Sequence, residues 1–493
     1  MVKLQDDFVE RYGSKILAVG AGSFLVSLVE ALLGVGVLET KLNVLNLNDA
    51  AVMDWREKIQ PFDWILYVSK QMNREEIRTI HTACREEKKN LLTATCIGNT
   101  GFAGPLVSPD SEGCWESAWR RLHHSAIRRD PIIPTISSAA EPMLANIVVF
   151  NMYRTITQAT KPELANRLLL LDLHTLEASY YSFLPHPLVT DKGMMMEQIN
   201  DLNRLLASDK GNQGDINHFL SFIDQLTSPQ SGILQLWDEG DLSQLPLSQC
   251  RVQVVDPLSE GPAELLPIMM RAGLTHMEAR KEAGLSGIEA YLTRMTSDRF
   301  EISAGATVEE AVYRGLQKCL MQQLARQMTD RMPNVLGVRL RDVQDMHCRY
   351  YLQALTTMRG APTIGLGDDV HGFPVVWIGD GDHWYGCVGL NRTLALRMAL
   401  QQALMKAQNR AETMTLQGVE ISNLVQEEAA TTHLDIEAVA DTACVEWIYE
   451  AVSVLKCNRM RLLIHAMMAE PLLNEHLGGL FGVRLAKEED QGE

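Results

Sequence analysis

The stretch ILAVGAGSFLVSLVEALLGVGVL, residues 16–38, decides the fold of the first part of this chain. Four apolar residues, Ile16–Val19, run into the glycine-containing turn Gly20–Ser23. A second apolar run, Phe24–Leu33, has the length of a helix and is followed by glycine. LNVLNLND, residues 42–49, has the composition of a second strand. Strand, tight turn, helix and strand together predict the opening βαβ unit of a Rossmann-like parallel sheet.

The same turn is a candidate nucleotide site. Gly20 and Gly22 let the backbone bend sharply and approach a phosphate, and Ser23 supplies a hydroxyl beside them. The fingerprint G-x-G-x-x-G is incomplete, because a leucine stands at the third glycine. Asn48, or its neighbour Asp49, stands where the fingerprint places an acid for the ribose. The pattern therefore predicts the fold and leaves nucleotide binding open.

A membrane span is the alternative for this long apolar stretch, in which Glu30 is the one charged residue. The glycine turn interrupts the helix near its start. What remains is a helix of about 10 residues, whereas a span needs about 20. We therefore expect no membrane association.

Length and charge limit the remaining function classes. A chain of 493 residues is too long for one ordinary core and predicts two or three domains. Its net charge of −17, from 45 basic and 62 acidic side chains, opposes non-specific binding to nucleic acid or anionic lipid. The N-terminal sequence MVKLQDDFVERYG lacks the pattern of a signal peptide, so we expect a cytoplasmic protein.

The nine cysteines contain no C-x-x-C pair. A scattered, odd set in a cytosolic chain is typical of free thiols, so we expect neither a structural zinc site nor another metal. Cys114, beside Trp115 and Trp119, is the thiol to weigh as a nucleophile. No His or Lys is fixed next to it by the sequence, and we interpret it as a half-buried thiol.

Strand-like and helix-like segments alternate as far as residue 190, which predicts an α/β domain over residues 1–190. Residues 191–217 mix a short helical pattern with polar and glycine-containing stretches and are predicted as a connector. Residues 218–493 form the remainder. Within the first domain we expect strands at 63–69 and 90–98, helices at 74–89 and 142–154, and a hairpin at 168–189.

The second part contains an internal repeat of the form G-x5-A-x3-[A/G]. Two residues after each glycine stands an N-cap residue, Thr275, Thr307 or Asn391. Glu278 and Glu310 complete capping boxes in the first two copies. Each copy therefore predicts a glycine turn, a capped helix and small residues for close packing. The copies are Gly273, Ala279, Ala283; Gly305, Ala311, Gly315; and Gly389, Ala395, Ala399.

The order of the N-terminal segments resembles the adenylating ThiF/E1-like family. The whole chain is similar to ThiF-like maturation proteins of thiazole/oxazole-modified bacteriocins, most specifically in residues 104–121, which begin GPLVSPDSEGC, and 168–186, which contain LLDLHTLEASYYSFLPH. The resemblance implies phosphate-binding Arg and Lys residues, of which only Arg56 and Lys58 are candidates, and paired zinc-binding cysteines, which are missing. It also implies an N-terminal winged-helix module that binds a leader peptide. About 15 residues precede the first strand, so we expect that module to be absent.

The repeat resembles YcaO domains, which use ATP to activate a peptide amide. The resemblance implies carboxylates three and six residues past the second small position, which hold magnesium and, through it, the ATP phosphates. Here these positions are Ser286 and Glu289 in the first helix and Lys318 and Met321 in the second. Glu289 is the residual acid, and we interpret it as a solvated helix residue. The resemblance thus implies a degenerate YcaO-like α/β domain without its own ATPase site.

Together these features predict an auxiliary maturation protein that presents a ribosomally synthesised precursor peptide to a separate YcaO-type cyclodehydratase. We nominate no catalytic residue and expect no cofactor. One alternative is an ATP-dependent adenylating or cyclodehydratase subunit that binds nucleotide at Gly20–Ser23 with Asn48 and Asp49. The other is a scaffold or oligomerisation subunit that binds no peptide. The resemblance also implies a homodimer.

Overall fold

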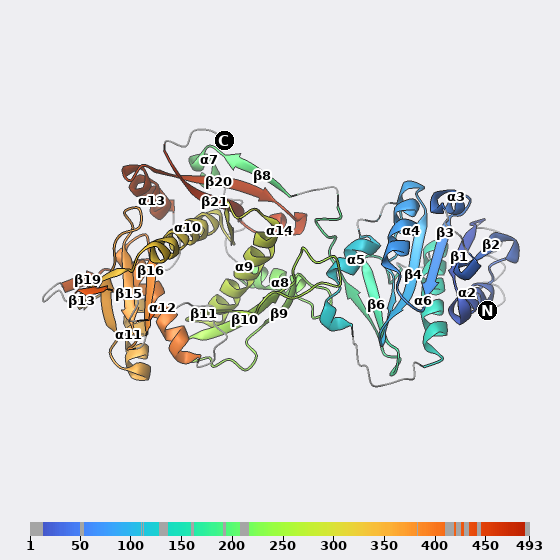
Figure 1. Ribbon diagram of the computed structural model, residues 1–493, viewed down its shortest axis with the longest axis horizontal. Helices are drawn as coiled ribbons and strands as arrows, with labels where there is room; N and C mark the ends of the chain where they lie inside the picture. Colours follow the sequence, from blue (N-terminus) through green and yellow to red (C-terminus); the bar gives the residue numbers. More distant parts are fainter. Residues whose placement is uncertain are drawn as a thin grey trace. The chain divides into compact units, whose positions relative to one another are not determined.

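The computed structural model divides the chain into two compact units (Figure 1). Unit 1 comprises Met1–Asp191, Ser228–Gln235 and Val255–Leu265, and unit 2 comprises Lys192–Thr227, Leu236–Val254 and Leu266–Glu493. The structure describes residues 13–49, 54–109, 111, 113–127, 137–158, 162–190, 194–207, 216–381, 383–409, 419–420, 425–427, 433–440 and 445–488.

Unit 1 is built on a seven-stranded sheet in the order β2-β1-β3-β4-β5-β6-β7. Strands β2, β1, β3 and β4 are parallel, and β5, β6 and β7 continue the sheet with antiparallel pairings. The predicted βαβ unit and the predicted hairpin are both present. The elements are β1 (Ile16–Gly20), α2 (Gly22–Gly34), β2 (Leu42–Asn46), α3 (Trp55–Ile59), β3 (Trp64–Ser69), α4 (Arg74–Glu86), β4 (Asn90–Ile97), β5 (Thr100–Ala103), α5 (Trp115–Arg121), α6 (Ala140–Thr157), β6 (Arg167–Asp172) and β7 (Ala178–Ser182).

The sheet of unit 1 is covered on both faces, as Figure 1 shows. One core lies beneath α2 and α6, which contribute Phe24 and Val148 among others. The other core lies beneath α3, α4 and α5, with Ile59, Ile80 and Trp115 fully buried or nearly so. The inner parallel strands β1, β3 and β4 are apolar runs because neither of their faces meets water, which is why they were predictable from the sequence.

Two segments of the second half complete unit 1, although the domain boundary predicted from the sequence places them within residues 218–493. The His123 amide donates to the Gln230 carbonyl over 2.8 Å, and the Ala263 amide donates to the Leu122 carbonyl over 2.7 Å. At Gly261, whose φ is +88°, a Cβ atom would lie 2.6 Å from the Trp119 ring. These long-range contacts hold the two segments beside α5. No local sequence pattern predicts such contacts.

Unit 2 contains three sheets, whose strand orders are β11-β10-β9, β12-β21-β20-β8 and β17-β16-β15-β14-β13-β18, with β19 paired to β13. Among the described residues, no helix combines the length and apolarity needed to cross a bilayer. The elements of the second half are β8 (Met195–Ile199), α7 (Leu202–Ala207), α8 (Ile216–Leu226), β9 (Leu234–Asp238), β10 (Ser248–Val254), β11 (Met269–Gly273), α9 (His276–Met295), β12 (Glu301–Gly305), α10 (Val308–Asp330), β13 (Asn334–Val343), α11 (Met346–Arg359), β14 (Thr363–Leu366), β15 (Val375–Gly379), β16 (His383–Val388), α12 (Arg392–Gln408), β17 (Val419–Glu420), β18 (Val425–Glu427), β19 (His433–Ile436), α13 (Val445–Cys457), β20 (Met460–Met468), α14 (Pro471–His476) and β21 (Gly479–Lys487).

The stretch 191–217 is not a bare connector. Its residues Met195–Ile199 form β8, which pairs antiparallel with β20 at the end of a four-stranded sheet. Helix α7 follows and buries Leu206. Parts of the stretch, 191–193 and 208–215, lie outside the described residues. A five-residue strand whose partner is more than 260 positions away in the sequence leaves too short a pattern for sequence analysis to detect.

The repeat predicted in the second part is a recurring strand–glycine–helix junction. Helices α9, α10 and α12 follow β11, β12 and β16, and Thr275, Thr307 and Asn391 cap them. A Cβ atom on Gly273 would lie 2.8 Å from the backbone nitrogen six residues later, and the equivalent distances at Gly305 and Gly389 are shorter still. Glycine is therefore required for each strand to end against the first turn of its helix.

The capping boxes differ between the first two copies. In the first copy the box is complete, with the Glu278 carboxylate accepting from the Thr275 amide. In the second, Glu310 Oε2 accepts from the Ala306 amide over 2.9 Å, one residue before the cap, so the predicted box is not reproduced. The other carboxylate oxygen of Glu310, Oε1, forms an ion pair with Lys281 Nζ of α9 over 2.7 Å.

We expect Gly305→Ala to lower the stability of unit 2 by about 1–3 kcal/mol, because the new methyl group overlaps the Ala311 backbone. The measurement is the midpoint of urea unfolding. Gly34→Ala is the matched control, since a Cβ there meets nothing within 4 Å. Equal midpoints for wild type and Gly305→Ala would contradict the close approach.

Candidate functional site

The glycine turn of unit 1 lies at the carboxyl edge of the parallel strands, where doubly wound sheets bind ligands. A Cβ on Gly20 would lie 2.6 Å from the Val68 carbonyl oxygen, so this glycine is needed for contact with β3. Gly22 has a φ of +62°, and a Cβ at this residue would meet no atom within 4 Å, so the turn is open at that point. The pattern therefore serves the fold at Gly20 and leaves space at Gly22.

A carboxylate of the chain itself occupies the polar side of this turn. Ser23 Oγ donates a hydrogen bond to Glu141 Oε2 over 2.7 Å, and Lys70 Nζ pairs with Glu141 Oε1 over 2.7 Å. Ala21, the N-cap of α2, makes no side-chain hydrogen bond. The negative end of Glu141 thus lies beside the first turn of α2, which is where a helix favours an anion. An incoming phosphate would have to compete with it.

Asn48 lies at the same edge, because β1 and β2 are parallel and Gly20 is in register with Asn46. The Asn48 side chain is exposed. The Asn48 backbone amide donates to Asn46 Oδ1 over 3.1 Å, in the turn Leu47–Asp49. The side chain of Asp49 lies outside what the structure describes. The structure therefore brings Gly20, Gly22, Ser23 and Asn48 to one edge without joining them by hydrogen bonds.

Glu289 in unit 2 is buried, and its interpretation as a solvated residue was wrong. Its side chain is 3% exposed. Arg314 donates to it through Nε over 2.9 Å and through Nη2 over 3.1 Å, Lys318 Nζ lies 2.8 Å away, and the Ala304 amide donates over 3.1 Å. Burial alone raises the pKa of Glu289, but the charges of Arg314 and Lys318 outweigh it and hold the pKa at about 2.

Arg314 was missed by the sequence analysis. It lies on α10, one residue before the small position Gly315, and also donates to Glu282 on α9. Burial alone lowers the pKa of Arg314, but Glu282 and Glu289 raise it well above its ordinary value. The only local signal was its spacing from Lys318, four residues on, which places both cations on one helix face.

All four positions at which the repeat pattern implies an acid are engaged within the protein. Ser286 Oγ accepts from the half-buried Arg271 over 2.8 Å, and Lys318 Nζ donates to the Ile302 carbonyl over 2.6 Å. Met321 Sδ accepts from the Val388 amide. Two carboxylates, Glu282 and Glu289, face the three cations Arg271, Arg314 and Lys318. This donor set does not fit magnesium, which requires oxygen ligands and an excess of negative charge.

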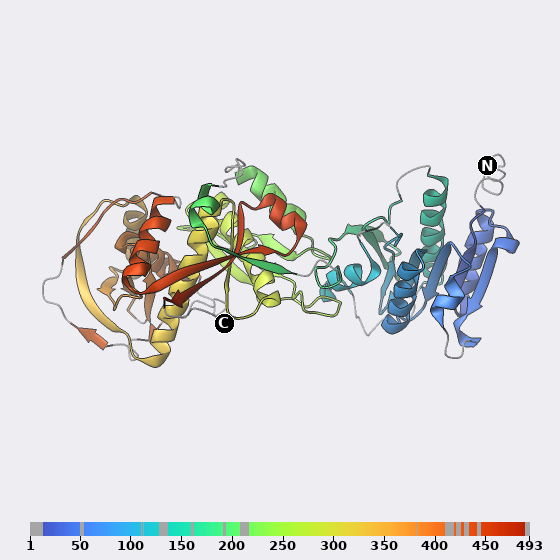
Figure 2. The same ribbon diagram turned by 90° about the horizontal axis from the view of Figure 1, so that it is seen from above.

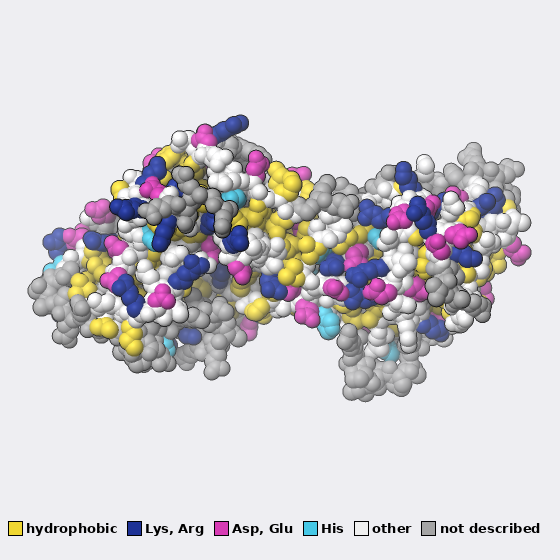
Figure 3. Space-filling view, turned by 45° about the horizontal axis from the view of Figure 1, so that its top comes forward, with side chains coloured by type: hydrophobic (Ala, Val, Ile, Leu, Met, Phe, Trp, Pro, Cys, Tyr) yellow, Lys and Arg dark blue, Asp and Glu magenta, His cyan; other side chains and the backbone are white. Residues whose placement is uncertain are grey.

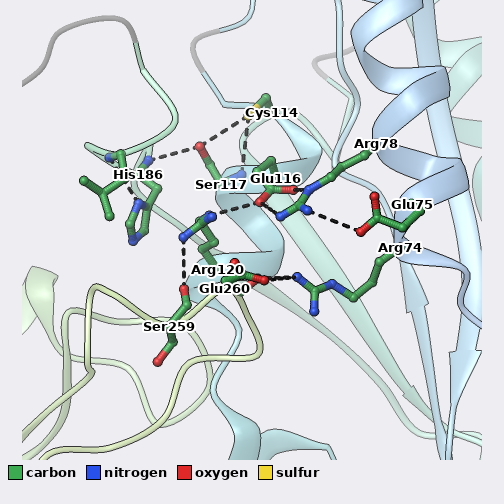
Figure 4. A network of polar contacts seen from close by, with 11 residues as sticks. Arg74, Glu75, Arg78, Cys114, Glu116, Ser117, Arg120, His186, Ser259 and Glu260 are labelled. Atoms are coloured by element: carbon green, nitrogen blue, oxygen red, sulfur yellow. Dashed lines mark hydrogen bonds and ion pairs between the residues drawn. The ribbon is translucent and has the colours of Figure 1, made fainter.

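Figure 4 shows a second polar network in unit 1, organised by Glu116 on α5. Its carboxylate accepts from Arg78 Nη2 over 2.7 Å and from Arg120 Nε over 3.0 Å. Arg120 also donates to the Ser259 carbonyl and Arg74 to the Glu260 carbonyl, both over 3.1 Å. The network joins α4 and α5 to the segment Val255–Leu265, so its evident role is to hold that segment.

The two blocks that carried the family resemblance meet beside this network. Ser117 Oγ accepts from the His186 amide over 3.0 Å, and the buried Arg121 donates to the Leu184 and Pro185 carbonyls. Cys114 is 2% exposed, more buried than expected, and its sulfur accepts from the Ser117 amide as the N-cap of α5. Burial, with Arg121 and Arg120 nearby, lowers the pKa of His186 to about 2. These contacts position the backbone and leave no exposed nucleophile.

The described cysteines and acids show no further site. The eight cysteines that the structure describes are all free, and Cys457 alone among them is exposed; Cys444 lies outside the described residues. Within the same part of the chain, no group of three His, Cys, Asp or Glu side chains is arranged to hold a metal ion.

Known proteins share the arrangement of this chain but little of its sequence. A heterocyclase solved in complex with substrate and cofactor superimposes with a TM-score of 0.60 and 11% identity, covering 96% of this chain and 80% of that one. The heterocyclase TruD gives 0.53 and 14%, covering 96% and 79%. The chain has the fold of these heterocyclases. At such identity the likeness concerns the fold alone.

The other comparisons do not assign this chain to a family. The Escherichia coli protein MccB, solved with a MccA variant, matches 37% of this chain at 13% identity, with a TM-score of 0.28 that carries no argument. No family model matches the sequence. No curated protein matches it either.

We expect Glu289→Gln to destabilise unit 2 by about 3 kcal/mol at pH 7, because the half-buried charges of Arg314 and Lys318 would lose their anion. Glu282→Gln, at a carboxylate whose side chain is 38% exposed, is the control and should cost less. Urea unfolding of wild type and both variants measures the difference. Equal losses at the two positions would contradict a cluster centred on Glu289.

The pH dependence of the same cluster has a definite sign. The folded-state pKa of Glu289 is about 2, below the value of about 4.3 for an unfolded chain, so its contribution is complete above pH 5 and is lost as the pH falls toward 2. Wild type should therefore lose stability over this range more steeply than Glu289→Gln. Parallel curves for the two proteins would show that Glu289 is not held ionised.

We expect Glu141→Ala to bind inorganic pyrophosphate about ten-fold more tightly than wild type, since Ser23 and Lys70 lose the carboxylate they now hold. Isothermal titration calorimetry measures the affinity. Glu177→Ala, which removes an exposed acid before β7, controls for the change in net charge. If both variants gain equally, the effect comes from net charge and the turn is no anion site.

Proposed function

We propose that this chain is a non-catalytic partner in the maturation of a ribosomally synthesised thiazole/oxazole-modified peptide such as a bacteriocin. It presents the precursor peptide to a separate YcaO-type cyclodehydratase, which forms the azolines. Support for the pathway comes from the heterocyclase fold, which extends over 96% of the chain, together with the ThiF-like and YcaO-like sequence patterns. One of those heterocyclases was solved with a substrate. The YcaO resemblance is what makes a peptide the expected ligand class.

The observation that carries the non-catalytic role is the ion-pair cluster at Glu289. Arg314 and Lys318 neutralise the one acid that remains at the four positions implied by the YcaO resemblance. A phosphate-bound magnesium ion needs several carboxylate oxygens facing it. In this cluster, Lys318 stands at one of the four positions where the YcaO resemblance implies an acid. Its ammonium group already donates to the Ile302 backbone carbonyl. The repeat therefore supplies structure where a catalytic homologue would need ligands.

One observation favours an ATP-using enzyme as the second candidate. The turn at Gly22 is open, and the parallel-strand edge beside it is the usual place for a nucleotide in such a sheet. Against it stand Glu141, which holds Ser23, and Asn48, which offers an amide where the ribose acid is expected. Binding at this turn would leave the YcaO-type cluster of unit 2 untouched, so the two candidates are separable by experiment.

Reconstitution with the precursor peptide and the separate cyclodehydratase tests the proposal, with mass spectrometry counting the waters lost on ring formation. We expect no rings and no ATP hydrolysis from this protein alone, and faster ring formation when it joins the cyclodehydratase. The stimulation should survive Gly22→Asp, which closes the open turn. Ring formation or ATP hydrolysis by this protein alone would overturn the proposal in favour of the enzyme.

Retention of the precursor peptide by the immobilised protein separates presentation from mere scaffolding. We expect retention without the cyclodehydratase present. A protein that binds the cyclodehydratase but never the peptide would be a scaffold, and presentation would be excluded.

A further inference from the structure

Strand β8 leaves one edge of a sheet in unit 2 unpaired among the described residues. The sheet order β12-β21-β20-β8 places β8 last, with β20 on its other side (Figures 1 and 2). Met195, Glu197 and Gln198 of this strand are exposed. An exposed edge presents a row of backbone donors and acceptors that another extended chain can pair with, and natural proteins usually protect such edges.

One face of the same sheet is basic beside that edge. Side chains alternate between faces along a strand. Ile464, Val483 and Leu485 point to the core shared with α10, so their neighbours point the other way. Cross-strand register then groups the opposite face: His465 lies opposite Gln198 on β8 and Gly482 on β21, and Leu463 lies opposite Arg484. This basic face consists of Gln198, Arg461, Leu463, His465, Gly482 and Arg484.

Arg484 and His465 lie together on the basic face, and Arg484 Nε is buried without a hydrogen-bond partner among the described residues. The Phe300 ring lies between these side chains, with its centroid 4.7 Å from the His465 ring and 5.7 Å from Arg484 Cζ. Gly482 makes room for the Met196 methyl group of β8, with which a Cβ there would collide. An aromatic ring flanked by cationic and imidazole groups suits a ligand that carries carboxylates.

Charge complementarity selects the occupant. The chain carries a net charge of −17, so an acidic peptide is repelled by most of its surface and attracted to the places where basic side chains gather. Figure 3 shows basic side chains, in dark blue, interspersed with acidic ones, in magenta, over the surface in that view. On the basic face, the β20–β21 register places Arg461, His465 and Arg484 close to one another. The face is thus a local exception on an acidic protein.

We propose that an extended segment of the precursor peptide, with acidic side chains at alternate positions, adds to the free edge of β8 as a further strand. In that position every second side chain of the peptide projects onto the basic face. Arg461 on β20 lies two strand spacings from the added strand, about 10 Å, which an arginine and a glutamate span together. Arg484, one strand further, contributes through its charge. This site rests on the proposed function, since the occupant is the precursor peptide.

The test uses fluorescein-labelled synthetic octapeptides and fluorescence anisotropy with the full chain. We expect the peptide of alternating Glu and Val to bind and its Lys–Val counterpart not to bind. Two further Glu–Val peptides carry N-methyl groups at every second residue, in either phase. One of these two should lose binding at least ten-fold, because strand addition uses the amides of one peptide edge.

Variants locate the site. Arg461→Gln and Arg484→Gln should each weaken Glu–Val binding by up to about five-fold, and added salt should weaken it further. Arg359→Gln, an exposed arginine at the end of α11, is the matched control and should bind like wild type. Equal loss in all three variants, or equal binding of the Lys–Val peptide, would overturn the site.

The site and the proposed function fail differently. If the Glu–Val peptide does not bind but the precursor is retained, the site on β8 is wrong and presentation stands. If the precursor itself is not retained, presentation fails, whatever the synthetic peptides do.

Discussion

The buried carboxylate of Glu289 constrains unit 2 more than any other single group. A carboxylate with a 3% exposed side chain loses nearly all of its hydration and remains charged only if cations and hydrogen-bond donors replace the water. Arg314, Lys318 and the Ala304 amide do so from α10 and β12. Glu289 therefore couples α9 to the next copy of the repeat. Its carboxylate oxygens are already engaged by the donors at that junction.

In the repeat, the demands of the fold are separate from the demands of a ligand. Its glycines are set by steric contact between a strand end and the first turn of a helix, and that demand is the same whatever ligand the helices face. The ligand positions obey no such demand. Lys318 stands at a position where the resemblance implies an acid, and it pairs with Glu289. This ion pair stabilises the cluster, and it also makes the cluster less able to hold a cation. At these positions, a cationic side chain favours stability, whereas metal binding would require an acidic one.

The parts of the structure that the sequence predicted are those decided by local geometry. The βαβ unit at residues 16–49, the hairpin after residue 167 and the three capped helices each depend on turn residues and on apolar runs within a short window. The burial of Glu289 depends on Arg314, 25 residues away, and the engagement of Ser23 depends on Glu141, 118 residues away. No periodicity in the chain encodes those pairings. The same holds for β8, whose partner strand lies near the end of the sequence.

Charges of opposite sign lie in the two candidate sites, and each sign matches that of the ligand the site would bind. The turn of α2 would bind a phosphate, and a carboxylate, Glu141, occupies its polar side. The helices of the repeat would bind a magnesium ion, and a guanidinium and an ammonium group face its remaining acid. In each place the protein supplies from its own side chains a charge of the kind that the ligand would have brought. An intramolecular ion needs no recruitment from solution, so it stabilises the fold at every ligand concentration. Under the proposed presenting role, such rigidity would serve to hold a surface in shape for the peptide.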